Sequence, residues 1–140
     1  MKKFQLLIVT FSLILILGCG KDDSADSFVG TWVAETIKVS GCADEGRNGS
    51  EDVPCDDSCY RLELMGDGNY TFQQDFTVES GFWVLDGKLK LCSDQEGETI
   101  CDEYIALLAQ GGLELSSDST SSGCVTTYIF MKEDPADTIQ

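Results

Sequence analysis

The sequence predicts an all-β fold, an eight-stranded antiparallel up-and-down β-barrel stabilised by disulfides. Short segments in which apolar and polar residues alternate follow one another along the chain, as expected for half-buried strands. Glycine-containing turns such as Asp86-Gly87 separate these segments, and Asp-Gly is a strong hairpin signal. The chain also has seven cysteines, which in a small domain are typical of disulfide cross-links. Strands joined by hairpins bury their apolar faces and lose their exposed edges when they close into a barrel.

The predicted strands are rich in Val, Ile, Thr and aromatic residues. Only residues 104–110 could also be helical, and this segment is short for a helix. Residues 41–59 are expected to form a long polar loop that holds three cysteines. A barrel domain at 28–133 and a loose polar tail at 134–140 complete the organisation. The strands are expected at 30–40, 60–64, 70–73, 81–85, 88–92, 100–110, 113–117 and 124–132.

The chain begins with a segment typical of export. Residues 1–3 are cationic and residues 4–17 are nearly all apolar, which is the charge order and length of a secretory signal. This run is short for a membrane span. It ends in Ile-Leu-Gly-Cys at Cys19, which resembles the lipobox of bacterial lipoproteins. We therefore expect residues 1–18 to be removed as a signal peptide, Cys19 to be lipidated with palmitate, and residues 19–27 to form an acidic tether.

The residues after the cysteine bear on the location of the protein. Gly20 is not the aspartate that retains some lipoproteins at the inner membrane. Lys21, Asp22 and Asp23 resemble the signal that sends lipoproteins of certain Gram-negative bacteria to the outer face. We therefore expect a protein held in the outer membrane by the lipid on Cys19 and exposed at the cell surface, with the periplasmic face as the alternative.

Composition excludes several classes of function. The formal net charge is −16, and a chain this acidic repels nucleic acid and anionic lipid headgroups. Histidine is absent, which removes the usual general base and the commonest metal ligand. We therefore expect no nucleic-acid partner, no enzymatic activity with catalytic residues, no cofactor and no metal site, and we expect a monomer.

Three motifs carry a resemblance to a known family. Gly-Thr-Trp at 30–32, GFWVLDGKLKL at 81–91 and YIFMK at 128–132 resemble, in this order, the lipocalin-like (calycin-type) domains of bacterial lipoproteins. The resemblance covers residues 29–132 and implies a compact barrel. Larger members of the family bind small apolar molecules in the cup, whereas the compact bacterial branch implies no settled activity.

The resemblance also implies how one end of the barrel is closed. Trp32 would lie there, packed by a basic residue of the last strand. Lys132 is the candidate, although lipocalins proper prefer arginine at this place. A lysine stem can cover an indole while its ammonium group lies over the ring face.

Six cysteines remain once Cys19 is assigned to the lipid, and they are expected to form three disulfides. A zinc site is disfavoured because no two cysteines have the Cys-x-x-Cys spacing. Cys92 and Cys101 could face each other across the base of a hairpin, so we favour this bridge. If the barrel closes, the end of the first strand lies near the start of the last, which favours the first of two sets for the other four cysteines. These sets are Cys42–Cys124 with Cys55–Cys59, and Cys42–Cys59 with Cys55–Cys124.

We expect the interior of so small a barrel to be filled by its own bulky side chains, with a small ligand in the cup as the alternative. An inward-pointing tyrosine hydroxyl would be the first sign of a pocket. The residues expected to line a ligand site or to form the core are Leu62, Leu64, Tyr70, Phe72, Trp83, Leu85, Tyr128 and Phe130, with Trp32, Leu89, Leu91, Leu113 and Leu115.

Two functions fit these observations. The first is a lipid-anchored binding module that holds a small hydrophobic ligand. The second is an accessory lipoprotein with a solid core, which binds a protein or glycan through the cysteine-rich loop at 41–59. The acidic residues of this loop lack the spacing of an EF-hand calcium site, and no two carboxylates stand out as a glycosidase pair.

Overall fold

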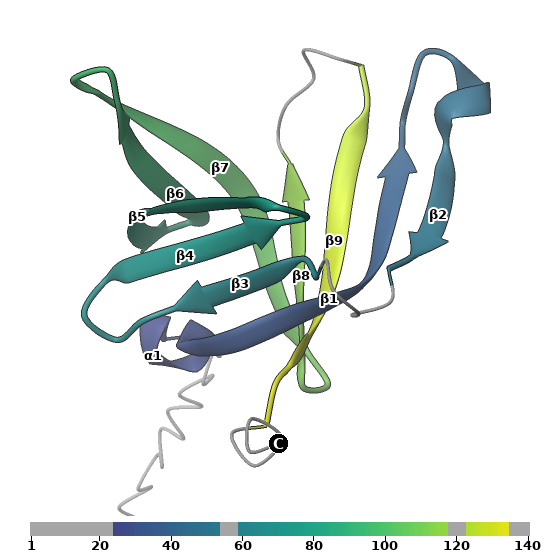
Figure 1. Ribbon diagram of the computed structural model, residues 1–140. Coiled ribbons are helices and arrows are strands. Elements are labelled where there is room, and N and C mark those ends of the chain that lie inside the picture. The colour runs from purple at the N-terminus through teal and green to yellow at the C-terminus, as the bar shows by residue number, and fades with distance from the viewer. Residues whose placement is uncertain (1–23, 54–58, 118–122, 135–140) are drawn as a thin grey trace, which may run out of the picture.

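Eight antiparallel strands close into a barrel in the computed structural model (Figure 1), which describes residues 24–53, 59–117 and 123–134. Each barrel strand pairs with the next one along the chain, and the first pairs with the last. The predicted up-and-down barrel is therefore confirmed. No helix in the described part of the chain is long and apolar enough to cross a membrane. The elements are α1 (Ala25–Phe28), β1 (Gly30–Ser40), the 3-10 helix η1 (Glu45–Arg47), β2 (Gly49–Asp52), β3 (Arg61–Leu64), β4 (Asn69–Gln74), β5 (Thr77–Asp86), β6 (Lys88–Gln95), β7 (Glu98–Ala109), β8 (Gly112–Ser117) and β9 (Val125–Lys132).

The seam of the barrel lies between β1 and β9. Their paired residues run from Trp32 and Lys132 at one end to Ser40 and Val125 at the other. One β-bulge in β1 shifts the register along this seam. Because β1 is 11 residues long, its first half pairs with β3 and its second half pairs with β2.

The strand β2 is a ninth strand outside the barrel, and it lies where a polar loop was expected from the sequence. Its four residues are all exposed, and its backbone pairs with β1 from Thr36 to Val39. A strand held by backbone hydrogen bonds alone needs no alternation of apolar residues, so the sequence Gly-Ser-Glu-Asp gave no strand signal.

The two ends of the barrel differ, and we call them the closed end and the open end. The closed end is formed by α1, the β5–β6 and β7–β8 turns and the last residues of β9. The open end is formed by the last residues of β1, the β4–β5 and β6–β7 turns and the first residues of β9. The β6–β7 and β1–β2 hairpins project past the barrel on opposite sides of the open end (Figure 1).

The helix α1 covers the closed end. Its residue Phe28 is 2% exposed, and the indole Nε1 of Trp32 donates a hydrogen bond of 2.8 Å to the Phe28 carbonyl oxygen. Residues 25–27, which the sequence assigned to the tether, therefore form an ordered turn against the barrel. The described chain enters and leaves the barrel at this end, through α1 and the residues after β9.

A hydrophobic core of buried side chains lies inside the barrel. Leu85 and Tyr128 are partly buried and pack against this core, while Phe28 and Ala34 belong to it without having been predicted. The buried core residues are Phe28, Trp32, Ala34, Leu62, Leu64, Tyr70, Phe72, Trp83, Leu89, Leu91, Leu113, Leu115 and Phe130.

Candidate functional site

All four tyrosines of the chain belong to the core or pack against it from inside the barrel. Tyr70 is only 1% exposed, whereas Tyr60, Tyr104 and Tyr128 are partly exposed. The three partly exposed rings therefore form the surface of the core rather than its centre. Tyr70 and Tyr128 were among the residues predicted to face inward, and Tyr60 and Tyr104 were not.

A chain of ring contacts links this surface to the buried core. The centroid of Tyr128 lies 6.2 Å from that of Tyr60 and 5.9 Å from that of Phe72, which it meets edge to face. Tyr128 also stacks on Phe130, with centroids 5.9 Å apart. These distances are those of favourable aromatic pairs. The rings of Tyr60 and Tyr128 are thus held in place by aromatic neighbours.

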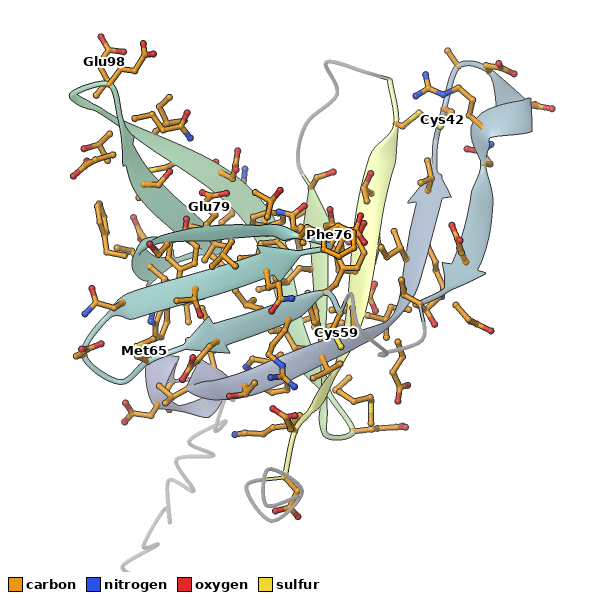
Figure 2. The ribbon with its side chains drawn as sticks, viewed as in Figure 1. Cys42, Cys59, Met65, Phe76, Glu79 and Glu98 are labelled. Atoms are coloured by element: carbon orange, nitrogen blue, oxygen red, sulfur yellow. A yellow bond between two sulfur atoms is a disulfide. The ribbon has the colours of Figure 1, made fainter. Side chains whose placement is uncertain are left out.

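Two carboxylates also face the barrel interior. Glu79 of β5 pairs with the buried Phe72, and Asp102 of β7 pairs with the buried Leu91. Directly paired residues of antiparallel strands point to the same face of a sheet, so both carboxylates point inward. The Tyr70 hydroxyl donates a hydrogen bond of 2.7 Å to Glu79 Oε1. Figure 2 shows Glu79 on the strand above β4.

These groups influence one another electrostatically. Burial and then the charge of Glu79 raise the pKa of the Asp102 carboxyl. Burial, followed by Asp102, Tyr128 and Glu79, raises the pKa of Tyr104. Burial, followed by Tyr60 and Asp102, raises the pKa of Tyr128. These interactions and the ring contacts link side chains of β4, β5, β7 and β9 with Tyr60, the residue before β3. We call this group the tyrosine–carboxylate site: Tyr60, Tyr70, Glu79, Asp102, Tyr104 and Tyr128.

No positively charged side chain of the described residues lies beside the two inward carboxylates. Arg61 pairs outside the barrel with Glu133 at 2.8 Å, and Lys88 and Lys90 each lie 3.4 Å from Glu103. Three other cationic residues are described. Lys38 alternates with the inward residues of β1, Arg47 belongs to η1, and Lys132 lies at the closed end. The inner surface of the described barrel is therefore negative.

The expected contact at the closed end is present. Lys132 Nζ lies 5.2 Å from the centroid of the Trp32 ring. The lysine stem lies across Gly30, where an added Cβ would come 2.7 Å from Lys132 Cε. A larger residue at position 30 would therefore crowd the lysine stem, and the φ of 146° also favours glycine there.

The disulfides gather toward the open end. Cys92 pairs with Cys101, as favoured from the sequence, and Cys42 pairs with Cys124. Cys59 is also disulfide-bonded, while its expected partner Cys55 lies outside the described residues, as does Cys19. The Cys42–Cys124 bridge joins the end of β1 to the start of β9, so it locks the seam at the open end.

One groove lies outside the barrel. It has a volume of about 600 Å³ and lies where the β1 bulge faces the end of β2 and the end of β9. Its walls include the outward residues Val33, Glu35 and Met131 of the seam, so it does not lie inside the barrel. No group of three or more potential metal ligands occurs among the described residues.

No protein-family model, curated protein or solved structure matches this chain. Its function must therefore be inferred from the site itself.

The sequence did not single out Glu79, which lay outside the strand predicted at 81–85. It did not single out Asp102 either, because a charged residue of a strand is expected to face water. A signal was nevertheless present. Glu79 lies in phase with the inward Trp83, and Asp102 lies in phase with the inward Tyr104, at the two-residue period of a strand. The outward carboxylates Glu63 and Glu114 have the opposite phase, next to buried leucines, as expected.

Proposed function

We propose that this protein is a lipid-anchored lipoprotein of the cell envelope that binds a small molecule at the tyrosine–carboxylate site. The anchor is proposed at Cys19, on the strength of the lipobox-like sequence. The disulfides support export to an oxidising compartment. As part of this proposal, the barrel topology and the contact of Lys132 with Trp32 support a relationship to lipocalin-like domains.

The observation that carries the binding proposal is the inward placement of every tyrosine. A tyrosine combines a large apolar ring with a polar hydroxyl, and such residues are typical of binding surfaces. Three of the rings are partly exposed, although they face the interior of the barrel. Beneath them lies the buried hydrophobic core. We therefore propose that the ligand lies on these rings and does not enter a deep cup.

The position of the anchor supports the same proposal. The helix α1 joins the barrel at the closed end, so a lipid on Cys19 would hold that end toward the membrane. The open end would then point away from the membrane, where a ligand can reach it. The proposed location is the outer membrane, with the cell surface favoured over the periplasmic face.

A second candidate is an accessory lipoprotein that binds a protein or glycan. The β1–β2 hairpin favours this candidate because β2 and η1 are exposed and project past the open end. Phe76, in the β4–β5 turn, is 90% exposed and is an additional contact for such a partner (Figure 2).

Native mass spectrometry of the protein, taken from its own host in mild detergent, tests the first candidate. We expect an additional mass that is lost on denaturation, and we expect Tyr128→Ala and Tyr104→Ala to reduce it. Phe82→Ala, which changes an outward aromatic residue, is the matched control. A bare protein, or a bound mass that survives both tyrosine substitutions, would favour the second candidate.

The anchor is tested separately by growing cells with an alkyne-labelled fatty acid. We expect the wild-type protein to carry the label in the membrane fraction and Cys19→Ala to lose it. Label that persists in Cys19→Ala would contradict the proposed anchor.

A further inference from the structure

The tyrosine–carboxylate site combines two features that together select one class of ligand. Aromatic rings present a negative face, and carboxylates present full negative charges. Resting on the proposed function, we propose that the ligand is an organic cation: an amine or quaternary ammonium compound with apolar substituents.

The rings supply the first half of the argument. Tyr60 and Tyr128 lie 6.2 Å apart with their planes tilted by 38°, so their faces do not cover each other fully. Each remains partly exposed on the inner side of the barrel. A cation that contacts such faces is attracted by the ring quadrupole, and aromatic cages of this kind recognise quaternary ammonium groups.

The carboxylates supply the second half. Glu79 accepts a hydrogen bond from Tyr70, but no described cation neutralises it. Asp102 faces the same interior, where burial and then the charge of Glu79 raise the pKa of its carboxyl. Two negative charges on one inner surface repel each other, and a positive group beside them would offset that repulsion. A cationic ligand would provide that group.

A comparison along β7 sharpens the point. Glu103 follows Asp102 directly and faces outward, where Lys88 and Lys90 each lie 3.4 Å from its carboxylate. The protein therefore places lysines beside the outward acid and none, among its described residues, beside the inward one. In this arrangement, a cationic ligand can pair with the Asp102 carboxylate.

Other ligand classes fit less well. A neutral apolar molecule would cover the two carboxylates without compensating their charge, which costs binding energy. A divalent metal ion prefers several oxygen ligands, and the described residues contain no group of three or more candidates.

The experiment is isothermal titration calorimetry of the protein in mild detergent with choline and with its neutral isostere, 3,3-dimethylbutan-1-ol. Benzyltrimethylammonium is a second cation with a larger apolar part. Choline and 3,3-dimethylbutan-1-ol have nearly the same shape, so a difference between their affinities measures the contribution of the positive charge of choline. We expect both cations to bind and the neutral alcohol to bind at least about tenfold more weakly.

Substitutions then assign the charge to named residues. Glu79→Gln and Asp102→Asn keep the side-chain shape, and we expect each to weaken choline binding by about three- to tenfold. Glu103→Gln removes the outward neighbour and should leave binding unchanged. Asp102 is exposed, so Asp102→Asn provides the test if Glu79→Gln disturbs folding.

The outcomes separate this inference from the proposed function. Equal binding of choline and the alcohol, or an effect of Glu103→Gln as large as that of Asp102→Asn, would overturn the cation while leaving a ligand site. Failure of both cations to bind at millimolar concentration would overturn it as well. Failure of the proposed function itself would instead be seen by native mass spectrometry, as a bound mass that the tyrosine substitutions do not reduce.

Discussion

The closed end and the open end of this barrel are held together by different means. At the closed end, α1 covers the barrel, Trp32 bonds to the backbone of α1, and Lys132 lies over the indole. At the open end, the interior carries tyrosines and carboxylates, and the strands are joined by disulfides. One end is stabilised by packing, and the other relies on covalent bonds.

The difference shows how a small barrel can keep polar groups inside. Burying apolar side chains stabilises a fold, whereas inward carboxylates and half-covered tyrosine rings contribute little or oppose it. The Cys42–Cys124 bridge holds β1 to β9 at the end where packing is weakest. The open end can therefore carry a binding surface without losing its strand pairing.

The largest effect is expected from truncating a closed-end aromatic residue. Trp32→Ala should lower the free energy of unfolding by about 3–5 kcal/mol, because it leaves a cavity in the core. Tyr60→Ala, at the open end, should cost clearly less because the ring is partly exposed. Urea denaturation of both variants measures the difference. Equal costs would mean that the two ends are packed alike.

The next effect concerns the disulfides. Replacing Cys42 and Cys124 by serine should lower the free energy of unfolding by about 2–4 kcal/mol. Replacing Cys92 and Cys101 should cost less, because that bridge spans 9 residues of chain and the other spans 82. Denaturation under non-reducing conditions ranks the two double variants. The reverse order would show that the seam does not need its bridge.

A smaller effect is the dependence of the free energy of unfolding on pH, which comes from the buried tyrosines. Burial is the main cause that raises the pKa of Tyr70 and of Tyr104 above the usual value near 10. Above about pH 10 the unfolded chain loses phenol protons that the folded protein keeps, so stability present at lower pH is lost as pH rises. The loss should be about 1.4 kcal/mol per pH unit for each such tyrosine.

Urea denaturation across the alkaline range measures this slope. Tyr104→Phe keeps the ring and removes the ionisable hydroxyl. It should therefore reduce the loss of stability per pH unit by the contribution of one tyrosine. A slope that is the same in Tyr104→Phe would contradict the burial of this hydroxyl.

The barrel could be predicted because its strands keep the two-residue alternation. Leu62 and Leu64 face inward between polar neighbours, and Asp86-Gly87 gives a hairpin. The strand β2 could not be predicted, because its exposed residues need no apolar pattern. The helix α1 was also missed, since four residues are too few for a periodic signal.

The site was predicted only in part. Tyr70 and Tyr128 were expected to face inward from their apolar rings. Glu79 was missed because the predicted strand began at residue 81, whereas β5 begins at Thr77. Asp102 was missed because a charged residue in a strand is expected to face water, and only barrel closure decides which face is inside.

The bridge between Cys42 and Cys124 also has a consequence for proteolysis. It joins the first and last barrel strands, so a single cut in any hairpin between these residues leaves two fragments that remain one covalent molecule. Linked fragments meet at the effective concentration of an intramolecular pair, which favours their strands staying together. After a single cut of this kind, the two fragments separate only if the Cys42–Cys124 bridge is also reduced.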